Sequence, residues 1–142
     1  MKYYFAYGSN LWWQQMQDRC PDSQYIGRGI LKGFRWIIST RGYANVVESS
    51  SDEVHGVIYK ISAQDEENLD ISEGVDLGCY TKEIMYVTSI GQSIECLVYV
   101  DPITDEGKPK AEYVDRINKG VIDTNLPENY VNTYIRRFTD SC

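Results

Sequence analysis

Histidine is almost absent from this chain of 142 residues, which contains a single one, His55. Nucleophilic sites that pair an imidazole with a serine or cysteine need a well-placed histidine, and most zinc sites need one too. His55 lies in the strand-like segment 53–59, and we expect it on the solvent face of a strand. The sequence therefore argues against imidazole chemistry and leaves carboxylates, hydroxyls and backbone groups to act.

The four cysteines lack the spacing of a redox or metal motif. Cys20, Cys79, Cys96 and Cys142 are scattered along the chain, and no two of them form a C-x-x-C pair. A domain of this length does not need disulfides to hold its core. We therefore expect free thiols in a reducing, cytoplasmic compartment, and no bound metal or other cofactor.

The chain also has no long apolar run and no excess of basic residues. No stretch approaches the roughly 20 apolar residues that span a bilayer, and residues 2–5 resemble a strand and not a secretory leader. The formal net charge of −7 repels nucleic acid and anionic membranes. We expect neither as a partner, although a local site for a small anion is compatible with this charge.

The remaining pattern is that of one globular domain, residues 1–142, with 42% hydrophobic residues. Strands are expected over residues 3–6, 25–40, 44–48, 54–61, 80–90 and 93–101, with a polar loop at 49–52. Helices are expected over residues 11–19, 63–73, 111–119 (closed by Gly120) and 127–138. Ser62 and Asp65 have the spacing of a capping box at the start of the second helix. The fold class is α+β, with about six largely antiparallel strands in a barrel-like sheet and short helices packed outside it.

The segment Tyr7-Gly8-Ser9-Asn10-Leu11 marks the point where a strand breaks and a helix begins. The first turn of a helix has N–H groups without acceptors and the positive end of the dipole, so anions bind there. Gly8 permits a left-handed backbone or a close approach, and Ser9 or Asn10 can cap the helix. Two interpretations stay open, a capped turn and a small-anion site.

Among the 21 acidic residues, Glu73 differs in its surroundings. It ends a helix between Ile71 and Val75, and Gly74 lets the chain turn directly after it. A carboxyl group that is partly buried there has a raised pKa and can exchange a proton near neutral pH. An exposed glutamate at a helix end is the other interpretation, and the local sequence favours neither.

Both motifs occur together in a known family. The main matches are Tyr7-Gly8-Ser9-Asn10-Leu11 to a Y-G-S-N-L/M loop and Leu69-Asp70-Ile71-Ser72-Glu73-Gly74-Val75 to L-D-x-x-E-G-V. Further matches are Arg19-Cys20-Pro21, residues 42–47, residues 54–59, Tyr80, residues 113–120 and residues 126–130. In this order and spacing, over nearly the whole chain, the sequence resembles the gamma-glutamylcyclotransferase-like (AIG2-like) family, whose fold it is then expected to share.

The resemblance implies a cyclotransferase without a cofactor. In the family's reaction the α-amine of a γ-glutamyl group attacks its own γ-carbonyl, so that 5-oxoproline forms and the amine partner departs. The resemblance assigns Glu73 as general base and then general acid. The implied substrate-binding residues are Tyr7, Gly8, Ser9, Asn10, Leu11, Tyr80 and Tyr113, although a chain with 12 tyrosines also offers simple core packing for those side chains.

The sequence departs from the family pattern around the leaving-group pocket, at Glu48, at Ser72 and in residues 76–79. The leaving group therefore stays open among an amino acid, a small amine, the ε-amine of a lysine isopeptide and a biosynthetic intermediate. A non-catalytic domain that binds a small anion on the same fold is the alternative from another class. A purely structural role has little support, because no long apolar stripe or extended exposed edge offers a surface for assembly, and the sequence does not define the oligomeric state.

Overall fold

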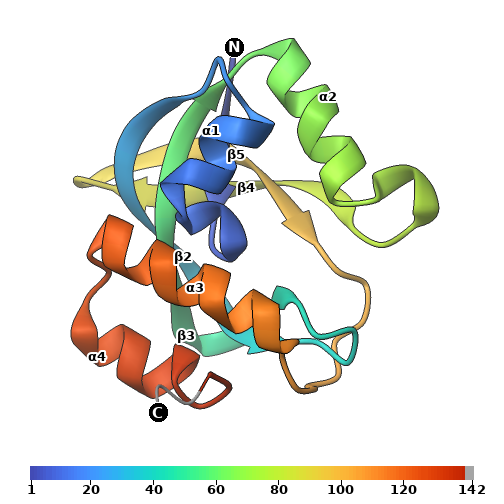
Figure 1. Cartoon of the computed structure of the whole chain (residues 1–142). Coiled ribbons are helices and arrows are strands. Elements are labelled where there is room, and N and C mark those ends of the chain that lie inside the picture. Colours follow the sequence, from blue (N-terminus) through green and yellow to red (C-terminus); the bar gives the residue numbers. More distant parts are fainter. Residues whose placement is uncertain (140–142) are drawn as a thin grey trace.

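The computed structural model describes residues 1–139, which form a closed β-barrel with helices outside it (Figure 1). The strands are β1 (Lys2–Ala6), β2 (Gln24–Ile38), β3 (Ala44–Ile61), β4 (Thr81–Ser89) and β5 (Gln92–Val100). Their order around the barrel is β1-β3-β2-β4-β5. Neighbours are antiparallel except β1 and β5, whose parallel contact closes the barrel. The predicted α+β barrel is confirmed, with five strands in place of about six.

The difference in strand number comes from β3, which runs without interruption through the predicted polar loop at residues 49–52. Its pairing with β2 passes from Lys32 opposite Glu53 to Phe34 opposite Glu48, so the polar residues bulge out opposite Gly33. Gly33 has a φ of 83° there, a conformation that favours glycine. The loop prediction was wrong because a bulge also tolerates exposed serines.

The bends predicted for the second strand are confirmed. The register of β2 shifts between Tyr25 and Gly27 and again between Lys32 and Phe34. The glycines at these shifts both have positive φ, 155° at Gly27 and 83° at Gly33. The bends let one strand of 15 residues pair with β3 over its length and with β4 near Ile30.

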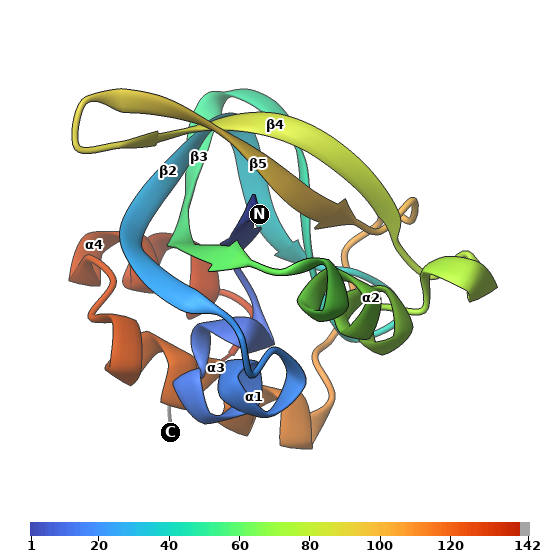
Figure 2. The ribbon, with the colours of Figure 1, turned by 90° about the horizontal axis from the view of Figure 1, so that it is seen from above.

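The helical elements are η1 (Ser9–Leu11), α1 (Trp13–Arg19), α2 (Ala63–Ser72), η2 (Val75–Leu77), α3 (Ala111–Thr124), α4 (Glu128–Tyr130) and the π-helical turn Val131–Ile135. Figure 2 shows α1, α3 and α4 together on the side of the barrel opposite the β4–β5 hairpin. The predicted capping box of α2 is confirmed, because the Ser62 hydroxyl accepts a bond of 3.0 Å from the Asp65 N–H and the Asp65 carboxylate accepts one of 3.1 Å from the Ser62 N–H.

The prediction that Gly120 closes α3 was wrong. The helix continues to Thr124 and ends at Asn125, which takes the left-handed conformation with a φ of 51°. A Cβ atom at Gly120 would lie 2.6 Å from the Leu11 Cβ and 2.8 Å from the Trp12 nitrogen. The glycine therefore serves close packing of α3 against the opening loop and not helix termination.

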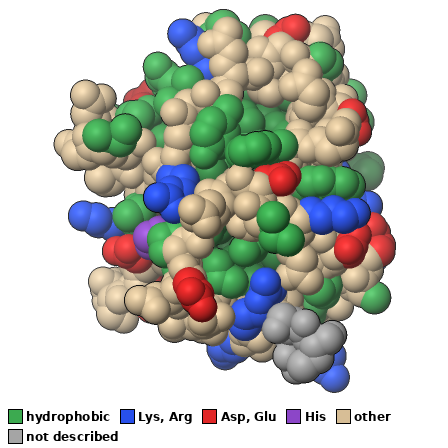
Figure 3. All heavy atoms as spheres, turned by 60° about the vertical axis from the view of Figure 1, so that its left-hand side comes forward, with side chains coloured by type: hydrophobic (Ala, Val, Ile, Leu, Met, Phe, Trp, Pro, Cys, Tyr) green, Lys and Arg blue, Asp and Glu red, His purple; other side chains and the backbone are tan. Residues whose placement is uncertain are grey.

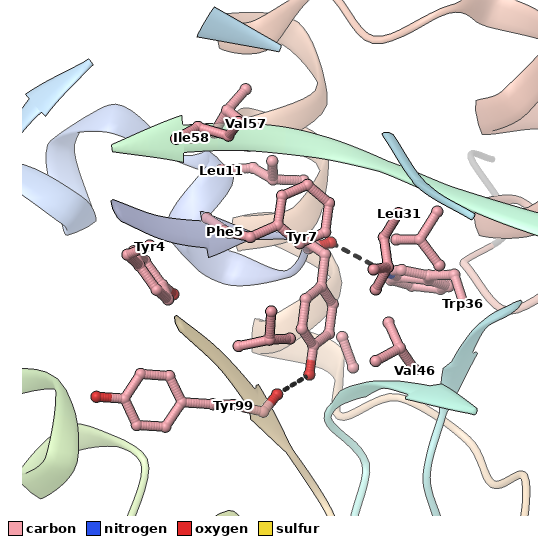
Figure 4. Packing of buried hydrophobic residues seen from close by; sticks show 14 of the residues in the cluster. Tyr4, Phe5, Tyr7, Leu11, Leu31, Trp36, Val46, Val57, Ile58 and Tyr99 are labelled. Carbon is pink, nitrogen blue, oxygen red and sulfur yellow. Dashed lines mark hydrogen bonds between the residues drawn. The ribbon is translucent and has the colours of Figure 1, made fainter. Parts of the chain in front are cut away.

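The barrel core fixes the end of β1, which leads into that loop. The Trp36 indole N–H donates to the Tyr7 carbonyl over 2.9 Å, and the Tyr7 hydroxyl donates to the Tyr99 carbonyl over 2.6 Å (Figure 4). Phe5 and Trp36 are fully buried beside them. Because these bonds hold the Tyr7 main chain and side chain, the residues that follow start from a defined position.

One face of the surface mixes charged and apolar side chains (Figure 3), and the described cysteines are free thiols. On the face drawn in Figure 3, acidic and basic side chains are interspersed with apolar ones. No helix within residues 1–139 is long and apolar enough to cross a membrane. Cys20 and Cys96 are buried and Cys79 is half-buried, all three as free thiols. Cys142 lies outside the described residues.

Candidate active site

A cavity of about 370 Å³ lies where the opening loop, the end of α2 and α3 meet the barrel. Of the residues singled out from the sequence, those on its wall are Tyr7, Gly8, Ser9, Asn10, Glu73, Tyr80 and Tyr113. The exception is Leu11, which is fully buried in the core and outside the cavity. Two motifs about sixty residues apart in the sequence therefore share one site.

The opening loop is a single 3-10 turn. The Leu11 N–H donates to the Gly8 carbonyl over 3.1 Å, and the Trp12 N–H donates to the Ser9 carbonyl over 3.0 Å. Trp12 is extended and separates this turn from α1. The expectation that Ser9 or Asn10 caps a longer helix was wrong, since neither makes a side-chain cap, and a turn this short has little macrodipole.

The loop instead offers individual backbone amides. Within residues 1–139 the N–H groups of Gly8 and Asn10 donate to no protein acceptor. Gly8 has a φ of −120° and so needs no left-handed conformation. A Cβ there would lie 2.8 Å from the Tyr113 hydroxyl, so the glycine permits close packing against α3, and a close approach to a ligand stays a prediction.

The polar side chains of the loop bind one another. The Asn10 amide donates to the Tyr4 hydroxyl over 2.9 Å, and its oxygen accepts from Gln15 over 2.9 Å and from Arg19 over 3.0 Å. The Gln15 amide also donates to the Ser9 hydroxyl over 2.7 Å. This network holds the loop in place and brings the positive charge of Arg19 to the cavity wall.

Glu73 follows the last residue of α2. Its N–H donates to the Leu69 carbonyl over 2.8 Å, and Gly74 then turns the chain with a φ of 64°. The side chain is half-buried on the cavity wall, and within residues 1–139 its carboxylate accepts no hydrogen bond. Burial raises its pKa above the ordinary glutamate value, while the charges of Arg19 and Arg41 act in the opposite direction. Of the two sequence interpretations, partial burial is the one found.

The three tyrosines use their hydroxyls to fix the backbone. The Tyr80 hydroxyl donates to the Ala44 carbonyl over 2.7 Å, and the Tyr113 hydroxyl accepts from the Ala44 N–H over 3.3 Å. Tyr7 binds the Tyr99 carbonyl as described above. Burial raises the pKa of Tyr113 to about 12, so its hydroxyl stays protonated at neutral pH. These tyrosines therefore pack in the core and also line the cavity.

Arg41 is a cavity residue that the sequence had indicated only as part of a turn. Its Nε donates to Asp101 Oδ2 over 3.0 Å, its Nη2 lies 2.9 Å from the same oxygen in an ion pair, and Nη2 donates to the Cys79 carbonyl over 3.0 Å. The guanidinium lies 5.2 Å from the centre of the Tyr80 ring. Further wall residues not singled out as site residues include Tyr4, Arg19, Tyr43, Tyr99, Glu112 and Arg116. Of these, Arg19, Tyr43 and Arg116 lie in segments that match the family.

Comparison with known proteins places this barrel and cavity in a family. Residues 53–134 match the model of the AIG2-like family. Human gamma-glutamylcyclotransferase is 30% identical over 138 residues, which cover 89% of this chain and 73% of the human protein, and the mouse protein is 31% identical with the same coverage. A solved gamma-glutamyl cyclotransferase structure superposes with a TM-score of 0.85 at 27% identity, covering 92% of this chain and 84% of that one.

The chain therefore belongs to the AIG2-like family, and it is an enzyme of the gamma-glutamylcyclotransferase type. A mouse AIG2-like protein of known structure, at 20% identity and a TM-score of 0.62, shares the fold. The expected family and fold are thus confirmed.

Proposed function

We propose that the chain converts a γ-glutamyl derivative of an amino acid or amine into 5-oxoproline and releases the amine. The observation that supports this function is the convergence of two kinds of group on one cavity. Glu73 brings a half-buried carboxylate without a hydrogen-bond donor, and Gly8 and Asn10 bring amides without an acceptor, within the described residues. A γ-glutamyl group carries an ammonium and a carboxylate, which complement these groups.

Glu73 moves the proton in this mechanism. The substrate α-amine is an ammonium at neutral pH, and the Glu73 carboxylate takes one proton from it. The free amine then attacks the γ-carbonyl carbon and forms a tetrahedral oxyanion. Glu73 returns its proton to the leaving nitrogen as the original C–N bond breaks. The attacking nitrogen loses a second proton on ring closure, and the released amine gains one in water, so one C–N bond forms, one breaks and no water is consumed.

The loop positions the substrate. The amides of Gly8 and Asn10 donate to the α-carboxylate or to the oxyanion that develops at the γ-carbon. The amine and the γ-carbonyl already belong to one molecule, so the loop contributes by fixing the bonds between them in the geometry of attack. Tyr7, Tyr80 and Tyr113 shape the wall around the glutamyl group. We assign Leu11 a supporting role in the core, because its side chain does not reach the cavity.

The test is direct. The purified chain is incubated with γ-glutamyl-alanine and a panel of γ-glutamyl amines, and 5-oxoproline is measured. We expect release by the wild type and a loss of activity on the order of 10²- to 10⁴-fold in Glu73→Gln. Glu112→Gln is the matched control, since Glu112 also lines the cavity but is exposed and paired with Arg116.

Two results oppose the proposal. Full activity in Glu73→Gln removes the assigned base. Binding of 5-oxoproline in calorimetry, together with no turnover on any compound of the panel, assigns the chain to the non-catalytic small-anion-binding alternative.

A further inference from the structure

The cavity wall carries two arginines that come from different parts of the fold. Arg19 ends α1 and donates to Asn10 of the opening loop. Arg41 lies in the turn between β2 and β3, which is well separated from α1 in Figure 1. Burial raises the pKa of Glu73, and the charge of each arginine acts in the opposite direction. The cavity wall therefore carries two positive groups that act on the proposed base.

Arg41 is held more rigidly than a surface arginine. Asp101 accepts a hydrogen bond from its Nε and forms an ion pair with its Nη2, and this carboxylate is itself fixed by a bond of 3.2 Å from the Ser39 hydroxyl and one of 2.8 Å from the Ile103 N–H. Asp101 is 1% exposed. Bonding to the Cys79 carbonyl and stacking on Tyr80 fix the guanidinium plane. An arginine anchored in this way presents its remaining donors without further loss of conformational entropy.

One nitrogen of Arg41 stays free. Within residues 1–139, Nη1 donates to no protein acceptor, whereas Nε and Nη2 are both used. Arg41 lines the cavity, and its side chain is 28% exposed. Arg116, the third arginine on the wall, is paired over 2.8 Å with Glu112 on the same helix. Arg41 is thus anchored by a buried carboxylate and still has a free donor nitrogen within the described residues.

The two arginines match a ligand with two carboxylates. A γ-glutamyl amino acid has one on the α-carbon of its glutamyl part, beside the α-ammonium, and a second on the leaving amino acid. The loop amides and Arg19 suit the glutamyl carboxylate, so Arg41 is left for the second one. We propose that Arg41 is a specificity-determining residue whose Nη1 binds a carboxylate on the leaving group, so that the chain prefers γ-glutamyl amino acids over uncharged γ-glutamyl amines.

This inference rests on the proposed function, and its test compares two substrates in the same protein sample. γ-Glutamyl-alanine and γ-glutamyl-alaninamide differ only in the charged group of the leaving amine. A hydrogen bond to a charged group contributes about 1.5–3 kcal/mol, so we expect kcat/KM to favour γ-glutamyl-alanine by about 10- to 100-fold. In Arg41→Met this ratio falls to about one, chiefly because KM for γ-glutamyl-alanine rises.

Two further variants separate recognition from folding. Arg41→Lys keeps a charge beside the buried Asp101 but loses the planar fork, and we expect a preference between those of the wild type and Arg41→Met. Arg35→Met removes an arginine that pairs with Glu106 and does not line the cavity, so its substrate ratio stays that of the wild type. Because the ratio is internal to each protein, a partly unfolded sample does not change it.

The outcomes are distinct. Equal kcat/KM for the two substrates in the wild type overturns the role of Arg41 and leaves the proposed function standing, as does an equal loss on both substrates in Arg41→Met. No 5-oxoproline from either substrate overturns the proposed function, and the inference falls with it.

Discussion

The hydroxyl of Tyr113 lies 2.8 Å from the position that a Cβ atom would take on Gly8. The same hydroxyl accepts from the Ala44 N–H over 3.3 Å. One side chain of α3 therefore packs against the main chain of the opening loop and binds the first residue of β3. The shape of the cavity depends on this contact, because it joins two of the walls.

Gly8→Ala is expected to destabilise the protein. The new methyl group overpacks the contact with Tyr113 and with the Ala44 side chain, which lies 3.1 Å away, and overpacking typically costs about 1–3 kcal/mol. Urea unfolding measures this loss. Tyr113→Phe removes the nearest atom, so the double variant loses less free energy of unfolding than the sum of the two single variants. Strict additivity contradicts the proposed contact.

Gly120→Ala is expected to lower stability although alanine favours helices by about 1 kcal/mol over glycine. The added Cβ meets the Leu11 side chain at 2.6 Å and the Trp12 main chain at 2.8 Å, so α3 is pushed away from η1. We expect a net loss of about 1–2 kcal/mol in denaturant unfolding. Ile122→Ala on the exposed side of the same helix is the control, with a change within about 0.5 kcal/mol. Stabilisation by Gly120→Ala refutes the explanation.

Glu73→Gln is expected to stabilise the fold at neutral pH. Burial raises the pKa of Glu73 in the folded state, so the folded protein binds more protons than the unfolded chain between the two pKa values, and stability falls as pH rises through that window. Glutamine does not ionise, so it does not cause this loss of stability as pH rises. Thermal unfolding from pH 4 to pH 8 should show Glu73→Gln gaining over the wild type as pH rises. A constant difference across this range contradicts the burial of the charge, and Glu112→Gln serves as the exposed control.

Arg19→Met is expected to move the acid limb of the pH–activity profile to higher pH. As the proposed base, Glu73 must be ionised in the free enzyme, so kcat/KM rises with pH through its pKa. The charge of Arg19 lowers that pKa, and its removal raises it. The position of the limb is the readout, since the variant also loosens Asn10 and reduces the rate. Arg116→Met should leave the limb in place, and a common shift in both variants excludes a specific effect of Arg19.

The local features of the fold followed from the sequence. The capping box of Ser62 and Asp65 and the bends at Gly27 and Gly33 depend on neighbouring residues, and they were predicted correctly. Gly120 was misread because its reason for being glycine is a contact with Leu11, more than a hundred residues away. A pattern of neighbouring residues contains no information of that kind.

The residues of the candidate site were likewise predicted only where a local motif marked them. Glu73 and the opening loop were found from their motifs, and the cavity brings them together. Arg41 was seen only as part of a turn, because its role depends on Asp101, sixty residues later, and on Tyr80. A charged residue in a polar turn is ordinarily solvated, so only the closed barrel reveals that this one is anchored at a cavity.

The packing of Gly120 against Leu11 also bears on how the chain acquires its site during synthesis. The opening loop and Glu73 leave the ribosome early, but the wall that α3 supplies follows some forty residues after Glu73. Until then the opening loop lacks its contact with α3, although β5, which closes the barrel against β1, precedes α3 in the chain. Because such distant contacts form late, a nascent or truncated chain can contain the proposed base and still have no substrate cavity.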